Sequence, residues 1–333
     1  MYSFTFRNYQ RKFRQPLQTS HGSWEVRKGI ILRLVDEKGN VGWGEIAPLP
    51  WFGSENLAQA EEFCRQLGKQ ITADNLAKIP DSLPACQFGF NSAQENCQPD
   101  SVCLSDNLVT NNCYLLPAGK KALTTWQTGW KQGKSTFKWK IGVGEITEEI
   151  ATFRQLSQAL PPTAKLRLDA NGGLNLATAK QWLKALDAAG NVEFLEQPLP
   201  PPQFEEMLHL DAEFVTAIAL DESVATLKQL QQCYSKGWRG IFVIKAAIAG
   251  SPQSLRQFCR ENQIDPVFSS VLETEIGRQA ALKLATEISL RDGYADLPVR
   301  YANLPVRALG FGIDHWFAAP QDNNWLEKLW KNS

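Results

Sequence analysis

The chain has 333 residues, 43% of them hydrophobic, and 35 basic side chains balance 35 acidic ones, so the formal net charge is zero. A chain of this length can bury a large core, which suits one large domain with a smaller one attached and excludes a disordered protein. Without a sustained basic stretch, neither nucleic acid nor an anionic membrane is the expected partner, and a small molecule is.

The lack of recognisable targeting signals and the pattern of cysteines indicate the cellular compartment. No apolar run approaches the roughly 20 residues needed to cross a bilayer, and the first seven residues lack the apolar centre of a signal peptide. The seven cysteines are odd in number and form no Cys-x-x-Cys pair, which disfavours both a disulfide framework and a zinc cage. We therefore expect a cytoplasmic protein. The sequence does not decide between a monomer and a homo-oligomer.

The first part of the chain is rich in strand signals and then helical. Alternating aromatic residues at positions 2, 4 and 6 predict a strand, residues 29–35 a second, and a turn over 36–40 leads into a third over 41–46. Ser54 is expected to cap a helix that ends near residue 67, and another helix is expected over 83–93. The polar stretch 95–112 is interpreted as a connection between domains.

From residue 113 onward, apolar runs alternate with helical stretches, as in a parallel α/β barrel. Strands are expected over residues 114–116, 137–141, 165–169, 192–196, 217–221, 241–245 and 266–270, with a last one near 309–313. Helices are expected over 146–160 and 176–189, for example, the second with Gly190 as its C-cap. The predicted fold is a modified TIM barrel, (β/α)7β, over residues 113–313. An α+β capping domain over 1–112, completed by 314–333, precedes it.

Five charged residues lie at the ends of successive predicted strands, at intervals of 29, 27, 25 and 24 residues: Lys140, Asp169, Glu196, Asp221 and Lys245. This spacing is about one strand–helix unit, so the barrel should gather all five at its C-terminal end, where active sites of such barrels lie. A carboxylate that ends a buried strand costs several kcal/mol unless it is paired or binds a metal. Three unrelated loop acids are the alternative, which the apolar run before each acid disfavours.

The three carboxylates and the lysines suggest one kind of chemistry. Oxygen ligands favour a hard cation, Mg²⁺ or Mn²⁺, over zinc, and the histidines at 21, 209 and 315 are not expected to bind it. Strand alternation directs Lys138 and Lys140 to the same face, into the barrel mouth. A lysine beside a divalent cation and another lysine is pushed toward its neutral form, which can take a proton from carbon. For Lys245, a lysine that only reaches for solvent is the alternative. The inferred reaction is proton abstraction α to a carboxylate, with the enediolate held by the metal.

These residues stand in motifs that resemble the enolase superfamily and, within its muconate-lactonizing-like subgroup, the o-succinylbenzoate synthases. Residues 42–50, Gly-Trp-Gly-Glu-Ile-Ala-Pro-Leu-Pro, resemble the capping-domain loop of those synthases, so the resemblance covers nearly the whole chain. The barrel motifs are Lys138-Trp139-Lys140, Leu168-Asp169-Ala170-Asn171, Glu196-Gln197-Pro198, Asp221-Glu222-Ser223, Val243-Ile244-Lys245 and Ser269-Ser270-Val271-Leu272-Glu273-Thr274.

The resemblance implies a carbon–oxygen lyase that dehydrates 2-succinyl-6-hydroxy-2,4-cyclohexadiene-1-carboxylate to 2-succinylbenzoate, on the route to menaquinone or phylloquinone. Lys140 would remove the α-proton and then, as its conjugate acid, help the hydroxyl leave from the same face. Lys245 would stabilise the enediolate from the opposite face, with a role as base also open. Mg²⁺, or Mn²⁺ in its place, would be bound by three ligands, Asp169, Glu196 and Asp221.

Supporting and substrate-binding roles follow from the same resemblance. Lys138 would keep the pKa of Lys140 low, because two adjacent ammonium groups repel each other, while Asn171 and Glu222 would support the metal site. Trp51 stands where the family commonly has a glycine, so the cap is expected to fit its ligand differently. Arg167 is expected either to bind substrate or to form a structural ion pair. The other expected substrate contacts are Ser269, Ser270, Thr19, Trp51 and Gly310, with Ser20 beside Thr19.

Other functions stay open at this stage. A racemase of N-acylated amino acids or a dipeptide epimerase would also need one lysine on each face, although residues 42–50 disfavour it. A muconate-type cycloisomerase would use two lysines as well. A catalytically silent binding or scaffold protein would not need both lysines and all three acids together.

Overall fold

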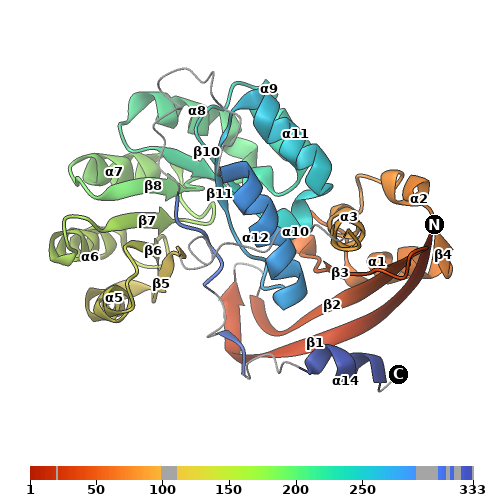
Figure 1. The fold of residues 1–333 in the computed structure, drawn as a ribbon. Helices are drawn as coiled ribbons and strands as arrows, with labels where there is room; N and C mark the ends of the chain where they lie inside the picture. Colours follow the sequence, from red (N-terminus) through yellow and green to blue (C-terminus); the bar gives the residue numbers. More distant parts are fainter. Residues whose placement is uncertain (20–21, 99–110, 290–306, 313–315, 319–323, 332–333) are drawn as a thin grey trace.

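The computed structural model describes residues 1–19, 22–98, 111–289, 307–312, 316–318 and 324–331. Figure 1 shows two parts, a barrel and a smaller capping domain built on an antiparallel sheet, with α10 and α12 between them. Among these residues, no helix is long and apolar enough to span a membrane. The six cysteines that fall in the described ranges are free and buried, and Cys103 lies outside them.

The capping domain is a four-stranded sheet in the order β3-β2-β1-β4. A long hairpin forms its centre, and the alternating aromatic residues of the first strand place Phe4 in the core. The strands are β1 (Tyr2–Thr19), β2 (Gly22–Asp36), β3 (Val41–Ile46) and β4 (Gln70–Ile71), and the helices are α1 (Leu57–Gln66), α2 (Ala73–Ala77) and α3 (Pro84–Asn96). On the other side of the sheet lies α14 (Trp325–Lys331), whose Trp330 packs edge-on against Trp43 with 4.7 Å between ring centroids (Figure 1).

Two glycines of β3 allow α3 to pack directly on the strand. A Cβ atom on Gly42 would lie 1.9 Å from the carbonyl oxygen of Ala93, and one on Gly44 would lie 2.0 Å from that of Gly89. Any larger residue would push the helix away from the sheet. The Gly-Trp-Gly-Glu motif is therefore a packing motif as well as a family signature, and it fixes where Glu45 lies.

Two predicted helix ends differ from the observed ones. Asn56, not Ser54, is the N-cap of α1, because its side chain accepts a hydrogen bond from the backbone N–H of Gln59 in a capping box. Ser54 instead accepts one from the N–H of Leu49 at 2.7 Å. Similarly, α7 (Leu176–Asp187) has its C-cap at Ala188 and not at Gly190.

The barrel has seven parallel strands hydrogen-bonded in chain order from β5 to β11. The strands are β5 (Tyr114–Leu116), β6 (Thr136–Lys140), β7 (Lys165–Asp169), β8 (Val192–Glu196), β9 (Ile218–Leu220), β10 (Ile241–Ile244) and β11 (Asp265–Phe268). The outer helices are α5 (Ala122–Lys131), α6 (Ile146–Ala159), α7, α8 (Phe204–Glu213), α9 (Leu227–Ser235), α11 (Pro252–Asn262) and α12 (Glu275–Ser289), with the short α10 (Ala246–Ala249) after β10. The predicted fold class is confirmed, within one or two residues at most strand ends.

A short eighth segment closes the barrel between its first and last strands. Leu309 bridges in parallel to Asn112, and the N–H of Cys113 donates to the Leu309 carbonyl at 2.8 Å. On the other side, the N–H of Gly310 donates to the Phe268 carbonyl at 2.8 Å. The predicted last strand is thus present as a pair of bridges at 309–310, and pairing on the first-strand side begins at residues 111–112.

Alternation along β6 separates its apolar and charged side chains. Trp139 is fully buried and faces outward to Trp182 of α7, with 6.4 Å between ring centroids, whereas Lys138 and Lys140 on either side of it are partly exposed. The two lysines therefore share the opposite, inward face of the strand. This orientation brings Lys138 to the acidic strand ends described next.

Candidate active site at the C-terminal mouth of the barrel

Neighbouring strands bring the predicted residues side by side. Lys140 pairs in register with Asp169, and Asp169 with Glu196, at the C-terminal ends of β6, β7 and β8. Asp221 directly follows β9 and Lys245 directly follows β10. All five residues of the regular spacing thus lie at the mouth of the barrel, as a parallel barrel of this register requires.

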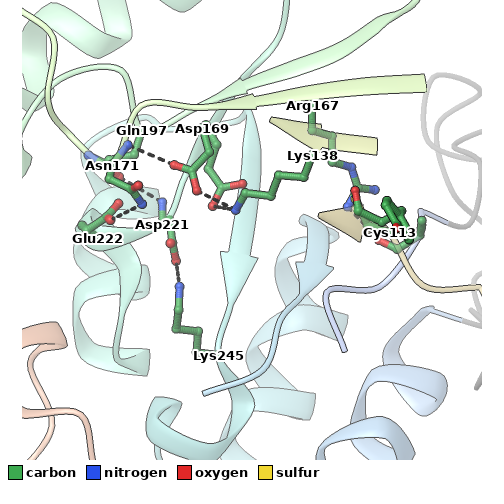
Figure 2. Close-up of polar contacts among 12 residues, drawn as sticks. Cys113, Lys138, Arg167, Asp169, Asn171, Gln197, Asp221, Glu222 and Lys245 are labelled. Carbon is green, nitrogen blue, oxygen red and sulfur yellow. Dashed lines mark hydrogen bonds and ion pairs between the residues drawn. The ribbon is translucent and has the colours of Figure 1, made fainter. Parts of the chain in front are cut away.

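The lysines reach the carboxylates directly (Figure 2). The Nζ of Lys138 lies 2.8 Å from Oδ2 of Asp169 and 2.7 Å from Oε1 of Glu196, and the Nζ of Lys245 forms an ion pair with Asp221. Among the described residues, Lys140 has no ion pair with an acid. Lys138 is therefore the cation that links two of the predicted metal ligands, and Lys140 is left with its amino group unengaged by the acids around it.

Burial perturbs the acids of this cluster strongly. It raises the pKa of Glu196 to about 8, with the nearby Asp169 adding to the shift, and raises that of Asp221 to about 6 despite the partner Lys245. Burial also raises the pKa of Glu222. For Asp169 the pairing with Lys138 outweighs burial, so its pKa is lowered. For Lys138, burial alone would lower the pKa, but Asp169 and Glu196 outweigh it and the pKa is raised well above its usual value.

The composition and charge of this cluster indicate whether it could bind a metal ion. No three acidic, histidine or cysteine side chains in the described ranges come together as a ready-made metal cage, and ammonium groups lie among the carboxylates. Four carboxyl groups, those of Asp169, Glu196, Asp221 and Glu222, nevertheless share the cluster with only two lysines that pair with them, Lys138 and Lys245. A set of buried oxygen donors that needs further positive charge fits a hard divalent cation.

Two residues in strained backbone conformations hold the acids in place. Asn171, with φ of 46°, donates its backbone N–H to Asp169 at 2.9 Å and its side-chain amide to Glu222 at 3.2 Å. Gln197, with φ of 38°, is fully buried, and its Oε1 accepts the backbone N–H of Asp221 at 2.9 Å (Figure 2). Positive φ in non-glycine residues is uncommon and persists where the surroundings fix it. The sequence reasoning assigned no role to Gln197, although it lies inside the Glu196-Gln197-Pro198 motif.

A cavity of about 230 Å³ lies beside Lys138 and Glu196. Its described walls include most of the predicted substrate contacts, and apolar side chains of β5, β10 and β11 complete them. A Cβ atom on Gly310 would lie 2.8 Å from Oγ of Ser269, so only glycine leaves this part of the cavity open. The predicted contacts that line the cavity are Arg167, Ser269, Ser270 and Gly310.

Arg167 forms the structural ion pair that was one of its two expected roles, and its contact with substrate stays a prediction. Its Nε donates to Glu193 at 2.6 Å and its Nη1 to the carbonyl of Ala308 at 2.8 Å, which makes it a member of a buried ion pair. Its Nη2 is buried without a hydrogen-bond partner among the described residues, in a side chain that lines the cavity. Arg307 extends this pair to a network of four side chains. Its Nη1 lies 2.8 Å from Oε1 of Glu193, and its Nη2 lies 2.7 Å from Oδ2 of Asp265.

The capping domain reaches the barrel mouth through Phe52 and Leu17. Trp51 is 38% exposed and packs edge-on against Trp24, with 5.0 Å between ring centroids, and it is not among the described residues that line the cavity. The next residue, Phe52, reaches the site, since Nζ of Lys245 lies 4.0 Å from its ring centroid. Leu17 of β1 also lines the cavity.

Some of the other residues named from the sequence lie wholly or partly outside the ranges that the structure describes. The backbone of Thr19 ends β1, but its side chain lies outside what the structure describes, as do Ser20, His21 and His315. His209 is exposed on α8. The hydroxyl of Ser270 donates to Glu273 at 2.8 Å and accepts from the N–H of Leu272 at 2.8 Å, so it shapes its own turn.

Comparison with known proteins places both parts of the chain in one family. Residues 122–301 match the enolase C-terminal domain-like family, and residues 3–97 match the N-terminal domain family of MenC. The chain is 43% identical to an o-succinylbenzoate synthase of Thermosynechococcus vestitus over 98% of each chain. It is 31% identical to the o-succinylbenzoate synthase of Edwardsiella ictaluri over 78% of each chain.

Comparison with solved structures agrees with the sequence comparison. An o-succinylbenzoate synthase of Thermosynechococcus elongatus, crystallised with Mg in its active site, superposes with a TM-score of 0.86 at 42% identity, over 99% of this chain and 100% of the other. The L-Ala-D/L-Glu epimerase of Bacillus subtilis superposes with a TM-score of 0.72 at 21% identity, over 85% and 86% of the two chains. The second likeness concerns the fold alone.

Proposed function

Because the chain belongs to the o-succinylbenzoate synthase family of the enolase superfamily, we propose that it dehydrates 2-succinyl-6-hydroxy-2,4-cyclohexadiene-1-carboxylate to 2-succinylbenzoate. This assigns it to the carbon–oxygen lyases and to the biosynthesis of menaquinone or phylloquinone. The observation that carries the proposal is the gathering of Lys140, Lys245 and three buried carboxylates at the barrel mouth, beside a cavity. A cytoplasmic location accords with the six free thiols, since reducing compartments keep cysteines unpaired.

Asp169, Glu196 and Asp221 would hold Mg²⁺, or Mn²⁺ in its place, with Asn171 and Glu222 supporting them. When bound, the ion supplies positive charge that stabilises the negative charge developing on the substrate carboxylate. The pairing of Lys138 with Asp169 and Glu196 supports this choice, because it marks the place where these side chains already accept a cation.

Lys140 takes the proton from the carbon α to the carboxylate in this proposal. Its amine must be neutral to do so, and no acid among the described residues forms an ion pair with it. Lys140 then returns the proton to the departing hydroxyl, so that water leaves. One C–H and one C–O bond break, and the new double bond completes an aromatic ring. Lys245 follows β10, four strands further along the barrel than β6, and its ammonium group stabilises the enediolate.

The cavity beside Lys138 fits the succinyl arm. Arg167 lines this cavity, its buried Nη2 has no hydrogen-bond partner among the described residues, and a guanidinium N–H is a strong donor to a carboxylate. Ser269 lies on the same wall, and the lack of a side chain at Gly310 keeps that wall open. We therefore assign the distal carboxylate of the substrate to this end of the cavity.

An activity assay tests the proposed function. Purified protein with Mg²⁺ and the cyclohexadiene substrate is expected to produce the ultraviolet spectrum of 2-succinylbenzoate, identified by mass and by comparison with the authentic compound. Heat-denatured protein in the same buffer is the control, because the dehydration also proceeds slowly without a catalyst when aromatisation drives it. A rate no higher than that of the control would refute the proposal.

A further inference from the structure

A carboxylate of the capping domain caps a helix of the barrel. Glu45 in β3 is fully buried, yet its side chain leaves its own sheet and accepts hydrogen bonds from the backbone N–H of Thr274 at 2.9 Å and of Gly277 at 2.9 Å. The hydroxyls of Thr274 and Tyr9 also donate to it. Thr274 immediately precedes α12, so Glu45 satisfies N–H groups that the helix itself leaves unpaired.

The carboxylate of Glu45 can approach the first turn of α12 closely because residue 277 is a glycine. A Cβ atom on Gly277 would lie 2.7 Å from Oε2 of Glu45, so a larger residue in the first turn of α12 would displace the carboxylate. The negative charge at the N-terminus of a helix is also favoured by the helix dipole. The two residues that meet here, Glu45 and Thr274, are 229 positions apart in the chain.

The segment just before α12 forms part of the cavity wall. Ser269, Ser270 and Leu272 line the cavity, and Leu272 has a φ of 64°, so the backbone turns sharply there. Glu273 holds the turn by accepting the N–H of Val271 at 2.7 Å and the hydroxyl of Ser270 at 2.8 Å. One end of this turn follows β11, and the other end, Thr274, is held by Glu45.

We propose that Glu45 is a positioning residue, which fixes the 269–274 turn against the cavity and thereby sets substrate affinity from the capping domain. It does not itself line the cavity. The proposal rests on the proposed function for the identity of the substrate. It gives the Gly-Trp-Gly-Glu motif a concrete task, because the glycines seat β3 on α3 and the glutamate links the seated strand to the substrate-binding turn.

The chain contains a matched control for this test. Glu55 is likewise buried, and it caps α3 by accepting the N–H groups of Ala85 at 3.0 Å and Cys86 at 2.7 Å, but this glutamate, in the loop before α1, and the helix both belong to the capping domain. Glu45→Gln and Glu55→Gln therefore remove the same charge from the same kind of helix cap. Only the first touches the turn at the cavity.

The experiment measures KM, kcat and Tm for wild type and both variants. Both variants are expected to lower Tm, whereas only Glu45→Gln is expected to raise KM, about tenfold, with kcat within about twofold of wild type. A KM unchanged in Glu45→Gln, or raised equally in Glu55→Gln, would overturn the proposal. Turnover by wild type and Glu55→Gln tests the proposed function separately, so the two failures are distinguishable.

A second readout does not depend on turnover or on the stability of one variant. Amide hydrogen exchange of the 269–277 segment in the substrate-free protein is expected to be faster in Glu45→Gln than in Glu55→Gln. Should Glu45→Gln fail to fold, Thr274→Val removes one donor to Glu45 and is expected to raise both KM and exchange in this segment to a smaller degree. Unchanged exchange and KM in the variant that folds would contradict the proposal.

Discussion

The ammonium group of Lys245 lies 4.0 Å from the centroid of the Phe52 ring, so the capping domain touches one of the two lysines of the barrel mouth. The face of an aromatic ring attracts a cation, and the attraction is larger where water is excluded. The side chain of Lys245 is only 11% exposed. Phe52 therefore helps to hold the side chain of Lys245 in place.

Replacing Phe52 by Leu keeps an apolar side chain but removes the ring face. We expect kcat to fall about fivefold to thirtyfold, which corresponds to about 1–2 kcal/mol for a cation–π contact partly shielded from water. Phe52→Tyr should retain most of the rate. Trp51→Leu is the neighbouring control, because Trp51 packs on Trp24 instead. Equal rates for wild type and Phe52→Leu would remove Phe52 from the site.

Lys140→Ala is expected to lower kcat at least by about 10²–10⁴-fold while leaving the fold intact, because a positioned general base contributes that much. Circular dichroism and Tm would check the fold. Lys180→Ala is the control, since Lys180 pairs with Glu213 on the exposed side of the barrel helices. A Lys140→Ala enzyme with the wild-type rate would require another base.

Chelation should stop turnover, and added Mg²⁺ or Mn²⁺ should restore it. Titration calorimetry gives a readout apart from activity: wild type is expected to bind Mg²⁺, and Asp221→Asn to bind it at least tenfold more weakly. Asp187→Asn is a suitable control, because Asp187 lies at the end of α7 and accepts the N–H groups of residues 215 and 216. Full activity after exhaustive chelation would contradict the assignment of the three carboxylates.

The buried carboxyl group of Glu273 is expected to make the stability of the protein depend on pH. Burial raises its pKa to about 7 in the folded protein, so the folded state keeps a proton that the unfolded state releases at lower pH. Its contribution to stability is therefore greatest below its usual pKa and is lost as the pH rises through about 7. We expect the unfolding free energy of wild type to fall relative to that of Glu273→Gln between pH 5 and pH 8, measured by urea denaturation. A constant difference over this range would show that the carboxyl group titrates normally.

The features that recur at regular intervals along the chain could be predicted from its sequence. The five charged residues could be found because each ends an apolar strand, and strand ends in a parallel barrel recur at nearly equal intervals. Alternation along β6 also placed both lysines on one face, with Trp139 on the other. Where two residues compete for the same local role, the pattern was insufficient: Ser54 and Asn56 are both good N-caps, and only the backbone path selects Asn56.

Contacts between distant segments could not be predicted in this way. Phe52 meets Lys245 across nearly two hundred residues, and Glu45 meets Thr274 across 229. Such pairs depend on how the capping domain sits on the barrel, which leaves no periodic trace in either segment. Within the barrel, the hydrogen bond from Arg167 to the carbonyl of Ala308 spans 141 positions and likewise leaves no local trace in the sequence.

The central claim is that this barrel mouth and cap are suited to dehydration more than to racemisation. The most direct test compares kcat/KM for the cyclohexadiene substrate with kcat/KM for racemisation of an N-succinyl amino acid, in one preparation saturated with Mg²⁺. We predict that the value for dehydration is the larger, by at least tenfold, and that Lys140→Ala abolishes it. A larger value for racemisation would contradict the account.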